Sequence, residues 1–341
     1  MTLPALRFSV LPGVTLQIRG DEAALRHYEA EYGSAATMPA EHDADAVAVT
    51  FDRRSRDGEP MPGGSVLAGS HKTVSWHADV SDPDARPMRA RIEIRGAPRW
   101  FGLSLTQGYL VEPLLSIAAA AVGVLLPAAG FVTDAGAIVL LGRSRSGKSS
   151  LTMRAAAAGL PVLGDDQVFL GRSGHVTRFP RRLRVYDDLR DTAPDAFARL
   201  PGWARRALWV RRLARSVTAG YVRPSLAIAT SAVLGAVESE EAPLARLVVL
   251  ERTANLSRIE VQRIDSDAAL ATAAAVMEDQ RRHLARLGPA WSRRLEEVAV
   301  SERSVLADAI ARVGAERVLI PNGWTAKASV DALWERLRGL K

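Results

Sequence analysis

The sequence has no cysteine, and only four of its 45 basic residues are lysine: Lys72, Lys148, Lys327 and Lys341. Without cysteine the chain can form no disulfide, no thiolate metal site and no iron–sulfur cluster, and it has no cysteine nucleophile. Its six histidines include no pair four residues apart, the spacing at which a helix presents two zinc ligands. Because lysine is so rare, a lysine that lies inside a motif becomes conspicuous.

The composition is that of an ordinary globular protein. The chain has 341 residues, of which 48% are hydrophobic and 24% charged, which excludes a fully disordered or collagen-like chain and leaves room for two or three domains. The net charge of +7 comes mainly from 41 arginines. A basic surface attracts acidic peptides, phosphates or nucleic acid. No recognised nucleic-acid motif accompanies the charge, so we expect no nucleic-acid partner.

We expect a cytoplasmic protein without a membrane span. No basic, apolar and small-residue pattern of a secretory signal stands at the N-terminus. Residues 113–133 carry no charge and are numerous enough to cross a bilayer. This run is rich in alanine and contains Pro127 and two glycines. It therefore fits better a buried helix over residues 109–126 that leads into a buried strand.

The pattern of apolar runs predicts an α/β protein of two parts. Residues 1–108 form a small β-rich domain with one helix near residues 23–32, and residues 109–341 form the second domain. In the second domain, residues 137–141 are a continuous apolar run typical of a central parallel strand. A helix over residues 150–158, a short strand over 161–163 and a hairpin over 168–179 are expected to follow.

One motif in the second domain carries chemistry. Residues 142–149 fit G-x-x-x-x-G-K-[ST] and lie between an expected strand and an expected helix, which is the setting of a phosphate-binding P-loop. Its glycines let the backbone approach phosphate oxygens, while Lys148 reaches the β- and γ-phosphates and Ser149 ligates Mg²⁺. The predicted nucleotide-binding residues are Gly142, Arg143, Ser144, Arg145, Ser146, Gly147, Lys148, Ser149 and Ser150. The motif does not distinguish ATP from GTP.

An acidic pair, Asp165 and Asp166, follows the P-loop lysine after one helix and one short strand. That interval returns both carboxylates to the phosphates. One carboxylate can hold Mg²⁺ and the other can accept a proton from an attacking hydroxyl. The spacing does not decide which carboxylate has which role.

The P-loop, its helix and the acidic pair together resemble the catalytic domain of the HPr-kinase-like family. The resemblance covers residues 115–180 well and 180–260 loosely. It implies a fold like that of ATP-dependent phosphoenolpyruvate carboxykinase, and phosphorylation of a serine hydroxyl with ATP and Mg²⁺. Carried over by position, the resemblance implies that Asp165 and Asp166 divide the roles of base and metal ligand, and we favour Asp165 as base and Asp166 as metal ligand. The acceptor would be a carrier protein or, as in relatives from lasso-peptide-type tailoring clusters, a precursor peptide. Two positions depart from the family: Arg145 replaces a usual glycine, and Pro127 stands where many relatives have the histidine of the reverse reaction, which implies a kinase only.

Two basic segments are weaker signals. In a strand, Arg182 and Arg184 would share one face and could stabilise transition-state charge, or could simply protect a strand edge. Residues 203–217 form a basic amphipathic helix with Trp203, Leu208, Leu213 and Val217. It could guide an acidic peptide or, less favourably, meet a membrane surface, or pack its apolar face and leave its basic face in water.

The sequence therefore predicts a kinase that transfers the γ-phosphate of ATP to a serine of a peptide or small protein. Lys148, Asp165 and Asp166 are the catalytic candidates, and Ser149 and Asp166 the metal ligands. Two alternatives stay open. The protein could phosphorylate a hydroxyl of a small molecule, or it could be a peptide-binding module whose binding is switched by a nucleotide. The oligomeric state also stays open, a homo-oligomer included.

Overall fold

The computed structural model describes residues 3–35, 47–52, 61, 63–218, 225–229, 239–254 and 256–338. Contacts divide the chain into two units. Unit 1 comprises Met1–Leu125 and Met277–Val305, and unit 2 comprises Leu126–Val276 and Leu306–Lys341. The architecture is mixed α/β, as the sequence predicts. The expected boundary at residues 108 and 109 falls inside unit 1.

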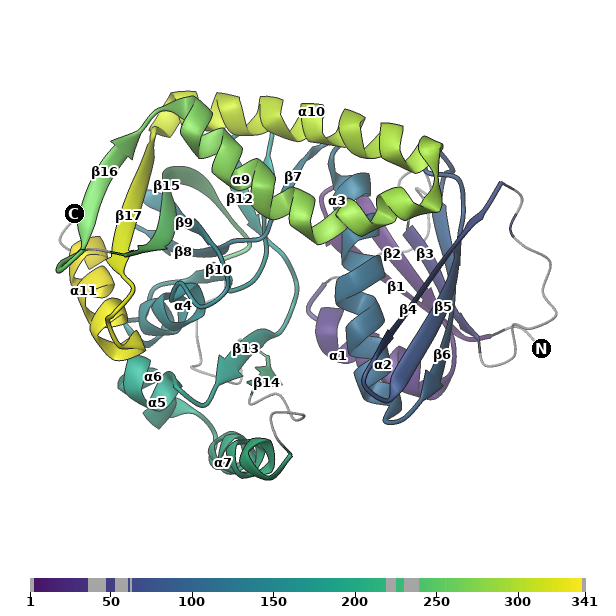
Figure 1. The fold of residues 1–341 in the computed structure, drawn as a ribbon, viewed down its shortest axis with the longest axis horizontal. Helices are drawn as coiled ribbons and strands as arrows, with labels where there is room; N and C mark the ends of the chain where they lie inside the picture. The colour runs from purple at the N-terminus through teal and green to yellow at the C-terminus, as the bar shows by residue number, and fades with distance from the viewer. Residues whose placement is uncertain are drawn as a thin grey trace. The chain divides into compact units, whose positions relative to one another are not determined.

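Unit 1 is built on a six-stranded sheet in the order β1-β2-β3-β6-β5-β4 (Figure 1). Its strands alternate buried and more exposed residues, as in β3, where Val47, Val49 and Phe51 are buried. Helices α1, α2 and α3 pack against the sheet. The strands are β1 (Ala5–Leu11), β2 (Val14–Arg19), β3 (Val47–Asp52), β4 (Ser65–His71), β5 (Val74–Val80) and β6 (Met88–Gly96). The helices are α1 (Glu22–Tyr32), α2 (Arg99–Thr106), a π-helix (Gln107–Val111) and α3 (Glu112–Ala119).

The last part of unit 1 comes from a distant part of the sequence. Residues Met277–Val305 include the end of α9 (Ser266–Arg281), a 3₁₀ helix (Arg282–Leu287) and most of α10 (Pro289–Val313). The ring of His283 stacks on that of Tyr109 with 3.8 Å between centroids, and the Ser301 hydroxyl donates to Ala120 O at 2.9 Å. These contacts place residues 109–120 and 277–305 in the same unit.

The expected helix over residues 109–126 is wrong in its second half. Helix α3 ends at Ala119, and the chain then forms strands β7 (Gly123–Leu126) and β8 (Ala129–Thr133), on either side of buried Pro127. The uncharged run over residues 113–133 is thus divided between a helix and two strands. Within the described part of the chain, no helix has both the length and the apolar character needed to cross a membrane.

Unit 2 contains most of the larger sheet, in which the strands run in the order β10-β8-β9-β15-β12-β11, with β17 beside β15 and β16 beside β17. Its central strands β9 and β15 are parallel, with Leu140 opposite Val248. Helices α4 and α11 share one core with these strands, which includes Phe131, Leu151 and Trp334. The remaining strands are β9 (Gly136–Gly142), β10 (Val162–Gly164), β11 (Val168–Gly171), β12 (His175–Arg178), β13 (Leu183–Tyr186), β14 (Ser225–Ile228), β15 (Glu241–Thr253), β16 (Glu260–Ile264) and β17 (Ala315–Pro321). The remaining helices are α4 (Lys148–Ala157), α5 (Leu189–Thr192), α6 (Pro194–Arg199), α7 (Gly202–Val217) and α11 (Ala326–Arg338).

Candidate functional site

The glycine-rich loop, residues 142–149, joins the fully buried strand β9 to helix α4. A Cβ on Gly142 would stand 2.6 Å from Leu250 O on the adjacent strand and 2.9 Å from Ser146 Oγ, so only glycine fits there. Gly147 caps α4 with φ +102°, in the left-handed region that favours glycine. Both glycines of the motif are therefore required by the backbone, one for space and one for conformation.

The loop is supported from behind by α11 and by the end of β15. The Cβ position of Gly147 lies 3.4 Å from Val330 on α11. Arg252 donates through Nε to Arg145 O and through a terminal nitrogen to Ser329 Oγ on α11, each at 3.2 Å. Arg145 has φ +68° and an exposed side chain, so this arginine adopts a left-handed backbone conformation.

Lys148 folds back over its own loop. Its Nζ donates to Gly142 O at 2.6 Å and to Arg143 O at 3.1 Å. Burial lowers the pKa of Lys148, while the carboxylates of Asp166 and Asp165 raise it.

Ser146 is the most enclosed polar side chain of the loop. It is 4% exposed, and its hydroxyl has no hydrogen-bond partner among the described residues. Ser149 and Ser150, in the first turn of α4, are half-buried. A buried hydroxyl without a partner is costly unless something else satisfies it, and an acceptor placed in the loop would do so.

Sheet order brings the acidic pair to the loop. Strand β10 pairs antiparallel with β8, and β8 pairs antiparallel with β9, so β10 and β9 run in the same direction. Both strands consequently end at the same edge of the sheet, where β9 delivers the glycine-rich loop and β10 delivers Asp165 and Asp166. The structure thus brings the acidic pair to the same sheet edge as the lysine motif.

The two carboxylates have different surroundings. Asp165 is 4% exposed, and its Oδ2 accepts a hydrogen bond from Arg184 N at 2.8 Å. Burial raises the pKa of Asp165 to about 7, and the charge of Asp166 adds to the shift, while the Arg184 N–H and the cations of Arg181 and Arg184 oppose it. The Asp166 side chain is 41% exposed, with its Oδ2 3.9 Å from Arg181. One acid is therefore enclosed and easily protonated, and the other is open to solvent.

Two arginines complete the site: Arg181, one of the arginines that follow the acidic pair in the sequence, and Arg252, which sequence reasoning did not single out. Arg181 reaches Asp166, whereas Arg182 and Arg184 do not share a strand face, because β13 begins at Leu183. Arg252 supports the loop, and its position is a recognisable signal: it stands near the end of a central parallel strand, where open α/β sheets bind their ligands. His175 lies on β12 with Glu241 at 3.9 Å and is not among the contacts of the loop or the acidic pair.

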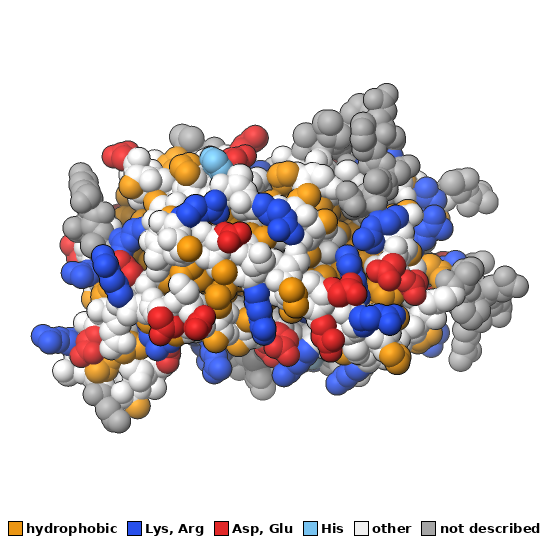
Figure 2. Space-filling model, turned by 90° about the horizontal axis from the view of Figure 1, so that it is seen from above, with side chains coloured by type: hydrophobic (Ala, Val, Ile, Leu, Met, Phe, Trp, Pro, Cys, Tyr) orange, Lys and Arg blue, Asp and Glu red, His pale blue; other side chains and the backbone are white. Residues whose placement is uncertain are grey.

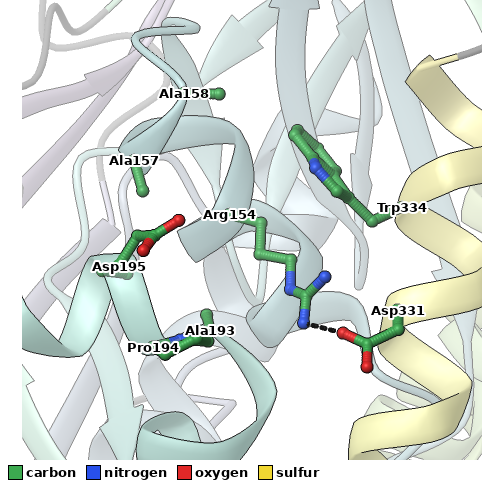
Figure 3. Close-up of a pocket in the computed structure, with 9 residues that line it drawn as sticks. Arg154, Ala157, Ala158, Ala193, Pro194, Asp195, Asp331 and Trp334 are labelled. Carbon is green, nitrogen blue, oxygen red and sulfur yellow. Dashed lines mark hydrogen bonds and ion pairs between the residues drawn. The ribbon is translucent and has the colours of Figure 1, made fainter.

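A separate pocket of about 530 Å³ lies toward the C-terminal end of α4 (Figure 3). Arg154 points from α4 to Asp331 on α11, and its Nε donates to Thr192 O at 2.5 Å. In this view Asp195 lies to the left of Arg154, and Trp334 lies above Asp331. None of the predicted site residues lines the pocket, so it is distinct from the glycine-rich loop.

Among the described residues, no three His, Asp or Glu side chains form a group that could hold a metal ion. Mg²⁺ in nucleotide sites commonly uses one or two protein ligands together with substrate phosphates and waters. The two predicted metal ligands, Ser149 and Asp166, would be a donor set of that smaller kind. No family model matches the sequence, and a search of curated proteins finds no match either.

Proposed function

We propose that this chain is an ATP-dependent kinase of the HPr-kinase-like type, with a serine of a peptide or small protein as the favoured acceptor. In this proposal unit 2 holds a P-loop catalytic domain related in fold to ATP-dependent phosphoenolpyruvate carboxykinase, and the six-stranded sheet of unit 1 is its β-rich companion. The observation that carries the proposal is that the parallel strands β9 and β10 deliver the glycine-rich loop with Lys148 and the acidic pair to the same sheet edge.

The loop fits the phosphates of a nucleoside triphosphate. Gly142 and Gly147 leave the backbone open to close approach, and α4 begins directly behind them with its positive dipole end. The unpartnered Ser146 hydroxyl supplies a buried donor. Lys148 now donates to two loop carbonyls, and phosphate oxygens would compete with those carbonyls for the ammonium group. A bound triphosphate would thereby accept a hydrogen bond from the Ser146 hydroxyl and would give Lys148 an anionic partner in place of the loop carbonyls.

Ser149 and Asp166 would hold Mg²⁺ with the triphosphate. Bound Mg²⁺ neutralises the charge of the phosphates and lowers the electrostatic barrier to their attack by a hydroxyl. The exposure of Asp166 suits a residue that must meet an incoming hydrated ion. Arg181, beside Asp166, is the cation best placed to oppose negative charge that develops on the transferred phosphoryl group.

Asp165 would act as the general base. Its Oδ2 already accepts from Arg184 N, so Oδ1 is the oxygen that would take the proton of the acceptor hydroxyl. The hydroxyl oxygen then bonds to the γ-phosphorus, the bond from phosphorus to the bridging oxygen breaks, and ADP leaves. A pKa of about 7 suits this role near neutral pH, because the carboxylate is available and still basic enough to hold a proton.

The direct test uses ATP labelled on the γ-phosphate, with Mg²⁺ and a host extract separated by size. The wild type is compared with Lys148→Ala and with Lys327→Ala. Lys327 is a matched control, because it is a lysine of the same unit whose side chain is 61% exposed in an ion pair with Asp331. We expect label on a peptide or small protein with the wild type and Lys327→Ala, and none with Lys148→Ala.

Other outcomes separate the alternatives. If label appears only in the small-molecule fraction, the proposal of a peptide kinase is replaced by that of a metabolite kinase. ATP binding without transfer, in an extract shown to contain the acceptor, would favour a nucleotide-switched binding module. Equal labelling by Lys148→Ala and the wild type would contradict the proposal that the glycine-rich loop is the site of phosphate transfer.

A further inference from the structure

Helix α7 is fixed to unit 2 by one face and leaves another apolar face in solvent. Ala204 and Leu208 are buried in a cluster with Leu183 and Leu200, and Arg211 donates to Ser225 O on β14. Of the four apolar residues that would be buried if the helix packed its apolar face inward, only Leu208 is buried. The outward stripe comprises Trp203 at 57%, Trp209 at 63%, Val210 at 54%, Leu213 at 47% and Val217 at 86% exposure.

The aliphatic and the tryptophan side chains of the outward stripe occupy different positions around the helix. At 3.6 residues per turn its five side chains fall within about 120° of the helix surface. Val210, Leu213 and Val217 occupy the middle of this arc, and Trp203 and Trp209 lie along its two borders. Tryptophan at the borders of an aliphatic strip is the arrangement of a helix that lies in a membrane–water interface, where indoles prefer the headgroup level.

The charge of α7 is of one sign. The helix carries five arginines and no acidic residue, and exposed Arg205 and Arg212 follow the border marked by Trp209. On the face of the molecule shown in Figure 2, by contrast, basic and acidic side chains are interspersed. Arg206 falls within the stripe itself, and its long aliphatic stem allows the guanidinium to bend back toward headgroups.

We propose that α7 binds the anionic headgroups of a lipid surface, with the outward stripe inserted among them. Figure 1 shows α7 at the lower end of unit 2, beyond α6. A convex helix face suits a flat lipid surface, whereas an acidic peptide helix is normally received in a groove. This surface is independent of phosphate transfer, since α7 contributes no residue to the glycine-rich loop or the acidic pair.

The test measures binding of the full chain to vesicles of phosphatidylglycerol and phosphatidylcholine in equal parts, and to vesicles of phosphatidylcholine alone. We expect binding only to the anionic vesicles, with a blue shift of tryptophan fluorescence, and its loss when salt is raised from about 0.1 M to about 1 M. Trp209→Ala is expected to weaken binding about ten-fold. Each of Arg205→Gln and Arg212→Gln is expected to weaken it about five-fold.

Two matched variants control for exposure and charge. Trp100, on α2 of unit 1, is 61% exposed, and Arg303, on α10, is an exposed arginine. Trp100→Ala and Arg303→Gln should leave vesicle binding unchanged. Equal losses in Trp100→Ala and Trp209→Ala would overturn the proposal, as would equal binding to neutral vesicles. Absence of vesicle binding together with Trp209-dependent binding of an acidic synthetic helix would assign the stripe to a peptide instead.

Discussion

Replacing Asp165 by asparagine should stabilise the protein while removing its proposed base. Burial and the charge of Asp166 raise the pKa of Asp165 from 3.8 to about 7. A carboxyl whose pKa is raised by folding favours the folded state at low pH, and that contribution is lost as pH rises through the folded-state pKa. Asparagine keeps an oxygen that can accept from Arg184 N and never ionises. The wild type should therefore lose stability relative to Asp165→Asn between about pH 4 and pH 7.

The expected gain in stability of Asp165→Asn follows from the size of the pKa shift of Asp165. About three pKa units correspond to about 4 kcal/mol of unfolding free energy at pH values above 7. Asp165 is 4% exposed, so solvent screening removes little of this difference. Between pH 5 and pH 8 the advantage of Asp165→Asn should grow by about 3 kcal/mol and then remain constant.

The difference in unfolding free energy between Asp165→Asn and the wild type is measured by urea unfolding without nucleotide, at several pH values from about 5 to about 8. Asp308→Asn is the control, because Asp308 is an exposed aspartate on α10 and its replacement should leave the pH dependence unchanged. An Asp165→Asn protein that is less stable than the wild type at pH 8, or a difference that does not vary with pH, would refute the reasoning.

Further predictions concern other groups. Glu302→Gln leaves the buried Arg281 without its ionised partner and should lower the free energy of unfolding in urea by about 3 to 5 kcal/mol. Glu297→Gln is the control, because Glu297 is exposed in its ion pair with Arg294, and it should lower the free energy of unfolding by under about 1 kcal/mol. Arg145→Gly relieves a left-handed backbone and should stabilise by up to about 1 kcal/mol in thermal unfolding; a loss of stability would contradict this. The kcat/KM for ATP should rise with pH through about 7, as Asp165 ionises; a flat profile would argue against it as base.

Local patterns in the sequence predict much of the fold because they depend on neighbouring residues. The apolar run over residues 137–141 becomes β9, and the glycine-rich loop leads into α4 as expected. The acidic pair is also placed correctly, since one helix and one strand must return the chain to the same sheet edge. Such relations need only short stretches of sequence.

Other features depend on contacts that the local sequence does not encode. An uncharged run suits a buried helix and a buried strand equally, so the change from α3 to β7 was not predictable from periodicity. The return of residues 277–305 to unit 1 rests on distant contacts such as that of Tyr109 with His283. Helix α7 packs through the small side chain of Ala204 beside Leu208, which leaves Trp209 outside although it is more hydrophobic.

The most direct test of the central claim compares ATP binding and phosphate transfer in Asp165→Asn and the wild type. Both proteins are held at saturating ATP and Mg²⁺ with the acceptor identified by labelling. Our account predicts that Asp165→Asn binds ATP as the wild type does, because the glycine-rich loop and Lys148 are intact, and that its initial rate of transfer falls by about 10²- to 10⁴-fold. Transfer at the wild-type rate by Asp165→Asn would contradict the assignment of Asp165 as the base.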